Sequence, residues 1–483
     1  MLDARMQKIL DIGIAISGEK NRDRLLDRIL TETVELTNCD AGTLYIFNGE
    51  ALEFKIMITR SMGVHNGGEH GEITLPPVPL SEKNVCACGV IYGKLINIDD
   101  VYENTTYDFT GPKKYDAMTG YNTRSMMVVP MEDDKGKIIG VMQLINAQDE
   151  EGNIIPFSKE YEQILLSMGS QAAICLVNMN YSKQIEDMLD SFVKVMSAAV
   201  DERSPYNANH SRNMVKYADK FIDWLNGNDA IEWKFDESTK RIFLMSVWLH
   251  DIGKLVIPAE VMDKPDRLGA HKKDVDFRLE KIGLIAEIEH LNGKLTDAEY
   301  EEKLAKISEV KALVEKVNSS GFLPDDLMAQ VEALGELRYM DKDEEKPWFT
   351  EAELYNLKIR KGTLTDEERK AMQSHVVITN KLLEQVSFEG EYKQVVGWAS
   401  SHHELLNGRG YPKGLSEEDI PREVRLLTIL DVYDALTAED RPYKPPMPRE
   451  KALAILDDMA KYHEVDVEVL SWFKESGAWS RNE

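Results

Sequence analysis

The sequence predicts an α+β protein with an antiparallel-sheet domain, a long connecting helix and an all-helical C-terminal half. Two strand-like runs flank Asn48-Gly49, which is a strong signal for a β-hairpin. Apolar residues recur in steps of three and four from about 158 to 200, and a helical pattern that now includes histidines continues after 201. A chain of 483 residues is too long for one ordinary core, so we expect two or three domains.

The N-terminal elements follow from the hydrophobic periodicity. Residues 1–36 carry apolar side chains at helical spacing and predict a helix. The runs 42–47 and 51–56 predict the two strands of the hairpin, and the runs 125–131 and 138–145 predict further strands. Together they indicate a mixed domain built on an antiparallel sheet.

The helix predicted over 158–200 carries two apolar stripes that are out of phase. They consist of Leu165, Met168, Ala172, Cys175 and Met179, and then of Ile185, Met188, Phe192, Val195 and Ala199. Such spacing is typical of a coiled coil with a discontinuity, as in a helix that joins two domains in a parallel dimer. A helix that packs on the sheet of its own domain shows the same stripe, so both interpretations stay open.

Charge and composition exclude several classes of partner. The net charge of −27 argues against a nucleic-acid polymer or an anionic membrane. No apolar run reaches the length of a transmembrane helix, and the first residues lack a signal-peptide pattern, so we expect a cytoplasmic protein without membrane insertion. The four cysteines lack zinc-site spacing and are expected to be reduced thiols.

Histidines and carboxylates gather in short motifs of the C-terminal half. His250-Asp251 follows an apolar helical stretch, His402-His403-Glu404 precedes a Gly-rich turn, and Asp431 lies one helical turn before Asp434. Imidazole and carboxylate together suit iron, manganese, zinc or nickel. The carboxylate of a His-Asp pair can bridge two ions, and two ions ~3.5–4 Å apart can clamp the reacting oxygens of a phosphodiester.

These motifs resemble those of the HD-GYP family, bacterial phosphodiesterases of cyclic dinucleotides within the HD superfamily. The resemblance lies in His250-Asp251-x-Gly253-Lys254, in the run from His402 to Pro412, and in the segment around Asp431 and Asp434. It implies two metal-binding groups that share Asp251, made up of His210, His250, Asp251 and Asp431, and of Asp251, His375, His402 and His403.

The resemblance also implies further roles. Asp251 and Lys254 would be catalytic, and Glu404 and Asp434 would orient metal ligands. The substrate contacts would be Asn407, Gly408, Gly410, Tyr411, Pro412, Arg441 and Lys444. The cofactors would be two divalent metal ions, with iron as the first choice and manganese as the second. A third ion is not expected, because Tyr206 stands where some members have a glutamate.

The N-terminal domain resembles GAF domains, notably those of cyclic-nucleotide phosphodiesterases. The resemblance lies in the segments 120–126, 139–147 and 156–158. It implies a small ligand, although Ala147 and Tyr161 replace the Lys and Asp that pair in nucleotide-binding relatives. The alternative is a GAF domain that serves only as a dimer scaffold.

The sequence thus predicts a GAF sensor domain over 1–178, a connecting helix over 179–200 and an HD-GYP domain over 201–483. A charged helical segment over 267–362, called the arm below, interrupts the last of these. The expected activity is metal-dependent hydrolysis of a cyclic dinucleotide, cyclic di-GMP in the first place, by a homodimer. The alternatives are a cyclic-dinucleotide receptor with little turnover and a di-iron oxygenase of the HD superfamily.

Overall fold

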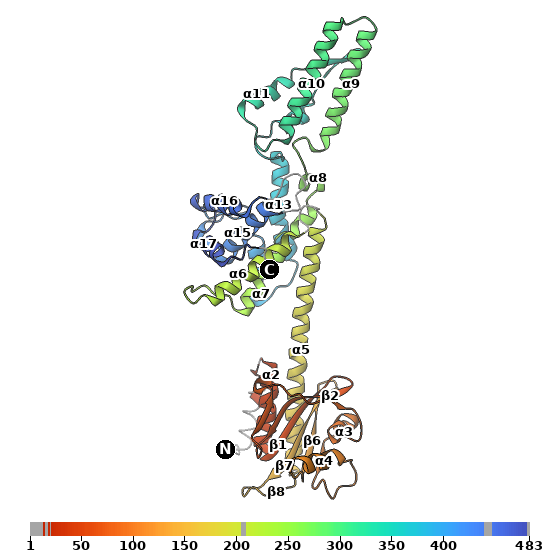
Figure 1. Ribbon diagram of the computed structural model, residues 1–483, viewed down its shortest axis with the longest axis vertical. Helices are drawn as coiled ribbons and strands as arrows, with labels where there is room; N and C mark the ends of the chain where they lie inside the picture. The colour runs from red at the N-terminus through yellow and green to blue at the C-terminus, as the bar shows by residue number, and fades with distance from the viewer. Residues whose placement is uncertain (1–12, 15–17, 20, 204–208, 439–446, 481–483) are drawn as a thin grey trace. The chain divides into compact units, whose positions relative to one another are not determined.

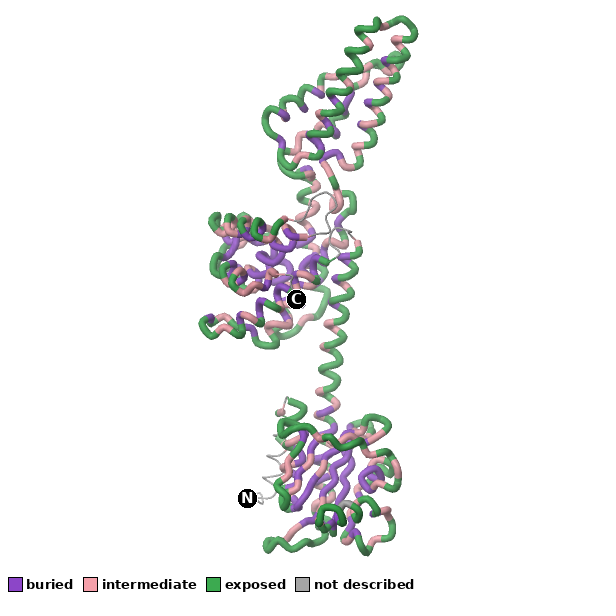
Figure 2. Tube along the Cα trace, in the orientation of Figure 1, coloured by how far each residue is buried: buried purple, intermediate pink, exposed green. Residues whose placement is uncertain are grey.

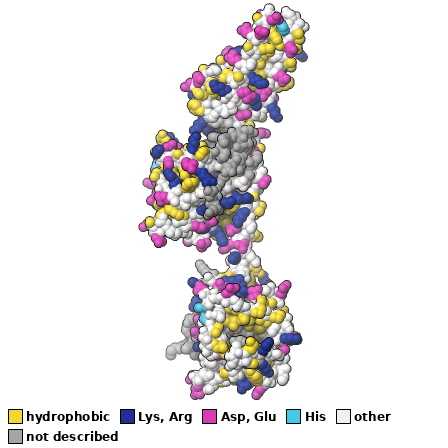
Figure 3. Space-filling view, viewed as in Figure 1, with side chains coloured by type: hydrophobic (Ala, Val, Ile, Leu, Met, Phe, Trp, Pro, Cys, Tyr) yellow, Lys and Arg dark blue, Asp and Glu magenta, His cyan; other side chains and the backbone are white. Residues whose placement is uncertain are grey.

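The computed structural model describes residues 13–14, 18–19, 21–203, 209–438 and 447–480. The chain divides into two compact units, Met1–Met188 and Leu189–Glu483, which are described separately. Within the described ranges no helix is long and apolar enough to cross a membrane. On the face drawn in Figure 3, acidic and basic side chains are interspersed.

The first unit is an antiparallel sheet with helices on both faces (Figure 1). The strands pair in the order β3-β2-β1-β7-β6-β5, with β4 added to β2 and β8 to β7. The strands are β1 Cys39–Phe47, β2 Ala51–Thr59, β3 Val64–Gly67, β4 Val78–Pro79, β5 Ile96–Ile98, β6 Met126–Glu132, β7 Ile138–Gln148 and β8 Ile154–Ile155. The helices are α2 Arg22–Thr37, the 3-10 turn η1 Gly68–His70, α3 Val85–Tyr92, α4 Thr110–Thr119 and the first part of α5 Glu160–Asp201.

The predicted hairpin is confirmed, because β1 and β2 pair antiparallel on either side of Asn48-Gly49. The Asn48 side chain accepts hydrogen bonds from the backbone N–H groups of Glu50 and Ala51, which closes the turn. Gly49 has a φ of 101°, a conformation that favours glycine. The pairing of β6 with β7 confirms the strands predicted near 125–131 and 138–145.

The prediction of one helix over 1–36 is wrong in part. Helix α2 begins at Arg22, and the side chain of Asn21 caps it by accepting from the N–H groups of Asp23 and Arg24. Glu19 and Asn21 are not helical, and residues 1–12, 15–17 and 20 lie outside the described residues. The helical spacing of apolar residues continues on both sides of Asn21, but Asn21 caps the start of α2, so one helix cannot run through this position.

Helix α5 is continuous, and its two apolar stripes lie on different faces. The first stripe packs into the sheet core of the first unit, where Leu165, Met168 and Ala172 are buried. The second stripe is exposed, with Ile185 at 61% and Met188 at 67% of full exposure. The change of phase therefore marks a change of helix face and not a break.

The second unit is mainly helical (Figures 1 and 2). Its principal core is formed by the end of α5 with α6 His210–Gly227, α7 Glu237–Leu249, α13 Asp366–Leu383, α14 Gln394–Ala399, α15 Arg422–Thr437, α16 Arg449–Lys461 and α17 Val467–Ser476. Short connections add η2 Ile252–Val256, α8 Ala259–Met262, η3 Gly269–His271, η4 Gly390–Lys393 and η5 Glu417–Asp419. The buried side chains of this core enclose the histidine motifs.

The arm has a hydrophobic core of its own. It contains α9 Lys272–Leu291, α10 Asp297–Ser319, α11 Asp325–Leu334, β9 Arg338–Asp341, β10 Glu344–Pro347 and α12 Glu351–Leu357. The expectation of helices is confirmed, but the β9–β10 hairpin was not predicted. The two ends of the arm meet, because the Thr363 hydroxyl lies 3.4 Å from the carbonyl oxygen of Lys264.

Candidate metal centre

Five helices bring seven of the predicted residues together in the second unit. His210 is the first residue of α6, and His250 and Asp251 follow α7. His375 lies on α13, Asp431 lies on α15, and His402-His403 follows α14. The residues His210, His250, Asp251, His375, His402, His403 and Asp431 are called the metal centre below.

One half of the metal centre surrounds His210. Its Nε2 atom lies 3.3 Å from His250 Nε2, 3.2 Å from Asp431 Oδ1 and 3.7 Å from Asp251 Oδ2. His250 Nε2 is 3.3 Å from the same Asp251 oxygen. Two imidazoles and two carboxylates therefore converge on one point of the buried interior.

The other half lies on the opposite oxygen of Asp251. Asp251 Oδ1 is 3.4 Å from His375 Nε2 and 3.9 Å from His402 Nε2. His403 Nδ1 is 3.7 Å from Asp431 Oδ2. Asp251 thus faces a group of ligand atoms with each of its two oxygens.

The donor set fits metal ions. Among the described residues, Asp251 Oδ1 is a buried oxygen that has no hydrogen-bond partner. A buried charged oxygen without a donor is costly unless a cation satisfies it. Three histidines and a second carboxylate around it supply the ligand types that suit iron, manganese or zinc.

Backbone carbonyls fix the tautomer of three histidines in the same way. The Nδ1 atoms of His250, His375 and His402 lie 2.7, 2.6 and 2.7 Å from the carbonyl oxygen three residues earlier. A carbonyl oxygen only accepts, so each Nδ1 carries the proton and each Nε2 presents its lone pair to the centre. His210 is held differently, with Nδ1 2.8 Å from Asp434 Oδ2.

Burial and neighbouring charges set the protonation states. Burial lowers the pKa of His375, and it lowers the pKa of His403 to about 4. Burial also holds the pKa of His402 well below its ordinary value, with help from the neighbouring imidazoles of His403 and His250. These three imidazoles are therefore neutral near pH 7, which is the form that binds metals.

The carboxylates of the centre are ionised. Burial opposes the charge of Asp251, but the neighbouring His250 imidazole and the Lys254 ammonium group outweigh it and hold the pKa of Asp251 well below its ordinary value. Burial likewise opposes the charge of His210, but Asp431 and Asp434 outweigh it and raise the pKa of His210 to about 10. The protein without metal thus keeps a proton on His210 that a metal ion would displace.

Lys254 lies directly beside the shared carboxylate. Its ammonium group donates a hydrogen bond to Asp251 Oδ2, three residues earlier in the chain. The lysine side chain is 17% exposed, so it reaches the edge of the centre from the solvent side. It can place a positive charge next to an anion that binds there.

Two threonines and a glycine hold the centre from behind, and sequence reasoning missed the threonines. The Thr379 hydroxyl donates to the carbonyl of His250 and accepts from the N–H of Gly253, both at 3.0 Å. The Thr428 hydroxyl donates to the carbonyl of His402 at 2.9 Å. A Cβ on Gly253 would lie 1.9 Å from the carbonyl oxygen of His375, so only glycine lets η2 approach α13 this closely.

The Gly-rich turn after the histidine pair is fastened by Glu404. Its carboxylate accepts from the N–H groups of Lys413 and Leu415 at 2.7 and 2.9 Å. The ring of Tyr411 lies against that of His403, with centroids 4.7 Å apart. A Cβ on Gly410 would come within 2.3 Å of the Leu405 nitrogen, so the turn folds back tightly on its own start.

The predicted substrate residues are only partly placed beside the centre. The Asn407 side chain donates to the carbonyl of Tyr462 and accepts from the N–H of Arg409, so it closes the turn. Gly408 is exposed, and so is Pro412. Arg441 and Lys444, as well as Tyr206, lie outside the described residues, and their roles stay predictions.

Asp201, the last residue of α5, is a neighbour of the centre that sequence reasoning missed. Its side chain is buried, and Ser211 lies 3.4 Å from its Oδ1 atom. Burial raises the pKa of Asp201 to about 6, although the neighbouring His210 and His250 oppose the rise. Its position at the end of a regular helix gave no sequence signal of this environment.

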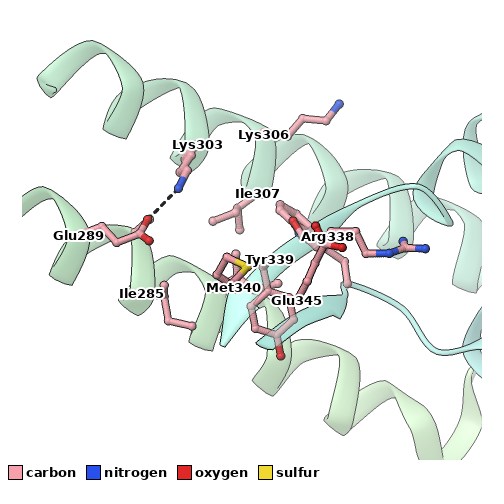
Figure 4. A pocket seen from close by; sticks show the side chains of 12 residues that line it. Ile285, Glu289, Lys303, Lys306, Ile307, Arg338, Tyr339, Met340 and Glu345 are labelled. Atoms are coloured by element: carbon pink, nitrogen blue, oxygen red, sulfur yellow. Dashed lines mark hydrogen bonds and ion pairs between the residues drawn. The ribbon is translucent and has the colours of Figure 1, made fainter. Parts of the chain in front are cut away.

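A cavity of about 250 Å³ lies in the arm and is not part of the metal centre (Figure 4). Its lining includes Ile282, Ile307 and Trp348. Lys303 on its rim is paired with Glu289 at 2.8 Å. The cavity wall thus combines apolar side chains with an ion pair and lacks the converging imidazoles of the centre.

Comparisons with known proteins agree with this architecture. A model of the GAF domain matches residues 21–176, and a model of the HD domain matches residues 350–469. The chain therefore carries a GAF domain followed by an HD domain, and both resemblances drawn from motifs are confirmed. The HD match begins at residue 350, near the end of the arm, so His210, His250 and Asp251 lie outside the matched range. Their place beside the matched histidines comes from the folded structure.

Curated relatives match over short stretches. The 3'3'-cGAMP-specific phosphodiesterase 3 of Vibrio cholerae is 40% identical over 97 residues, which are 20% of this chain and 20% of that protein. A probable cyclic di-GMP phosphodiesterase of the same organism is 38% identical over 106 residues, 21% of this chain and 24% of that protein. The dual 3',5'-cyclic-AMP and -GMP phosphodiesterase 11A of Takifugu rubripes is 26% identical over 162 residues, 32% of this chain and 17% of that protein. The matches thus span about a quarter or less of each relative's length.

Proposed function

We propose that this chain is a metal-dependent phosphodiesterase that hydrolyses a cyclic dinucleotide, cyclic di-GMP in the first place, under the control of its GAF domain. The observation that carries the proposal is the position of Asp251, whose two oxygens face two groups of imidazoles while Lys254 lies beside it. The names of the bacterial relatives support the substrate class. A cytoplasmic location stays a prediction.

The division of the chain follows the same proposal. Residues 1–178 form the sensor, 179–200 the connecting helix, and 201–483 the catalytic domain that the arm interrupts. His210, His250, Asp251 and Asp431 would hold one divalent ion, and Asp251, His375, His402 and His403 the other. Iron is the first choice for both ions and manganese the second. When bound, such ions supply Lewis acidity and activate water near neutral pH.

Side chains beside the metal centre would bind the nucleotide and stabilise the negative charge of its phosphate. Lys254 stabilises negative charge that develops on the phosphate oxygens, because its ammonium group lies at the solvent side of the centre. The Tyr411 ring forms a wall next to His403 on which a base can stack. The Gly-rich turn, fastened by Glu404, lets backbone approach the nucleotide closely.

A turnover assay with protein purified under anaerobic conditions tests the proposal. We expect cyclic di-GMP to be converted to the linear dinucleotide or to GMP, with 3'3'-cGAMP as the comparison substrate and metal content measured on the same sample. Tight binding of the dinucleotide without conversion would instead make the chain a receptor. Oxygen consumption without hydrolysis would make it an oxygenase.

The proposal includes a parallel homodimer along α5. The exposed residues Ile174, Tyr181, Met188 and Val195 recur every seven residues, and they alternate with Asn178, Ile185, Phe192 and Ala199. This is an uninterrupted heptad seam. The charged residues of that stretch, Lys183, Glu186, Asp187, Asp190 and Lys194, all fall outside the seam and the positions that flank it. A second copy of the same helix can therefore pack on it without charge repulsion.

Insertions in α5 test this seam and its regulatory role. Four residues inserted after Ser182 shift the heptad phase, whereas seven restore it. We expect the four-residue insertion to change basal turnover or the dimer fraction and the seven-residue insertion to be milder. A monomer by light scattering for the parent chain, or identical kinetics for all three proteins, would overturn the coupling.

A further inference from the structure

A second group of metal-ligand side chains lies in the GAF domain. Asp27 is on α2, His65 is on β3 and His70 ends η1. His65 Nε2 lies 2.6 Å from Asp27 Oδ1, and His70 Nε2 lies 3.6 Å from Asp27 Oδ2. One ligand atom from each of the three residues lies within 4.8 Å of the others.

The local sequence places the two imidazoles together. Between His65 and His70 the chain reverses direction at Gly67 and Gly68, whose φ angles are 97° and 56°. A Cβ on Gly67 would lie 1.9 Å from the carbonyl oxygen of Lys55, so glycine is required at this position. A hydrogen bond of 2.8 Å from the Gly67 N–H to the carbonyl oxygen of Gly71 closes the loop.

The result is a pair of stacked rings on one carboxylate. The ring centroids of His65 and His70 are 3.8 Å apart, with 29° between the ring planes. Nearby, Arg24 forms an ion pair of 2.8 Å with Glu69, so the positive charge of Arg24 is paired with a carboxylate other than Asp27.

Hydrogen bonding accounts for one half of the cluster only. The contact of 2.6 Å between His65 and Asp27 is a hydrogen bond, but the 3.6 Å between His70 Nε2 and Asp27 Oδ2 is too long for one. The second oxygen of Asp27 and the second imidazole thus face each other across a gap that is too wide for a hydrogen bond. A cation coordinated by both would satisfy them together.

We propose that Asp27, His65 and His70 bind a divalent transition metal ion with the preferences of zinc. Two neutral imidazoles and one carboxylate make a three-ligand set of the kind that holds zinc and leaves one position to solvent. The His70 side chain is 45% exposed, so the position faces water and free metal can enter. An ion at this site ties α2 to the edge of the sheet, and it is independent of the proposed phosphodiesterase activity.

Equilibrium dialysis of the full chain against Zn²⁺, with bound metal measured by elemental analysis, tests the site. His70→Gln keeps the hydrogen bond of His65 to Asp27 and should bind one ion fewer per chain than the parent. The matched control is His290→Gln in the arm, because His290 also pairs with a single carboxylate, Asp297, at 3.4 Å. The control should bind as many ions as the parent.

A second measurement separates zinc binding in the GAF domain from misfolding of a variant and from ions bound at the metal centre. Zn²⁺ should raise the unfolding midpoint of the GAF domain in the parent and in His290→Gln, but less in His70→Gln and in Asp27→Asn. Circular dichroism should show the same secondary structure in all four proteins. Equal zinc content and equal midpoint shifts in the parent and the two site variants would overturn the proposal.

Discussion

The metal centre and the arm both bury charged side chains in the second unit, but they satisfy those charges differently. In the arm, Arg267 is fully buried and donates to the backbone carbonyls of Ile359, Val317 and Ser320. In the centre, Asp251 lies among imidazoles that present lone pairs, and one of its oxygens has no hydrogen-bond partner among the described residues.

This difference separates a structural charge from a functional one. Three backbone carbonyls are fixed acceptors for the arginine and hold the end of α10 beside the segment that follows α12, although its Nη2 atom, like Asp251 Oδ1, is buried without a hydrogen-bond partner among the described residues. The aspartate is surrounded by acceptors as well as by Lys254, and the set is complete only with added cations. Burial of a charged side chain is therefore weak evidence of function by itself. The chemical type of the groups around the charge, donors or acceptors, is the stronger evidence.

The largest effect is expected at the shared carboxylate. Asp251→Ala should lose both metal ions and all measurable turnover, because each of its oxygens faces a separate group of ligands. Elemental analysis and the dinucleotide assay check this. Asp457→Ala is the control, since Asp457 pairs with Lys474 at the surface and should retain both properties. Metal content of the parent level in Asp251→Ala would contradict the ligand assignment.

Removal of the lysine should affect rate but not metal. Lys254→Ala should keep the ions and lose about 2–4 kcal/mol of transition-state stabilisation, which is roughly 30- to 900-fold in turnover rate. Lys461→Ala is the matched control, because Lys461 pairs with Asp458 at the same spacing on the surface. An unchanged rate constant for Lys254→Ala would remove this residue from the mechanism.

The arm should respond in the opposite way. Arg267→Met should destabilise the arm by about 1–3 kcal/mol for each carbonyl left without a donor, while metal content stays at the parent level. Hydrogen exchange over 267–362 measures the first effect. The exposed Arg338, which also donates to backbone carbonyls, gives the control Arg338→Met. Loss of metal in Arg267→Met would show that the two regions are energetically coupled.

Asp201 offers a smaller and pH-dependent test. Its pKa is raised to about 6, so its protonated form adds stability below about pH 3.8 that is lost as the pH rises through about 6. In metal-stripped protein Asp201→Asn should therefore be more stable than the parent above pH 6, by at most about 3 kcal/mol. Thermal unfolding at several pH values checks this, and a gain that persists unchanged at low pH would contradict it.

The smallest effect is expected when the arm is replaced. A short Gly-containing loop between Lys264 and Thr363 should leave the metal content of the second unit unchanged, because these residues already lie within 3.4 Å of each other. Elemental analysis of the soluble, folded variant is the measurement. Loss of metal there would mean that the arm supports the centre.

Most ligands of the candidate site could be predicted because each lies in a short motif whose residue types are unusual together. His250-Asp251 and His402-His403 carry the signal in sequence, and the structure brings them within a few ångströms. Thr379 and Asp201 could not be predicted. Their roles depend on which backbone groups and charges lie beside them after folding, and neither residue is unusual in a helix.

The sequence left the fold ambiguous where one pattern had two physical causes. The two stripes of α5 allowed two interpretations, and in the structure Leu165 packs on the sheet whereas Ile185 is exposed, so the stripes serve different contacts. The β9–β10 hairpin lacks the alternation of apolar and polar residues that marks a half-buried strand, because much of it is exposed. Local periodicity shows that a face is apolar, but not which partner covers it.

The closeness of Lys264 and Thr363 has a practical consequence for protein engineering. A loop whose ends already meet adds little chain entropy when its contents are exchanged, so the position accepts inserted domains with adjacent termini. A fluorescent protein or a ligand-binding module grafted there would become a reporter joined to the second unit at two points. The position of the arm, between Lys264 and Thr363, is therefore a suitable insertion site for building biosensors on this protein.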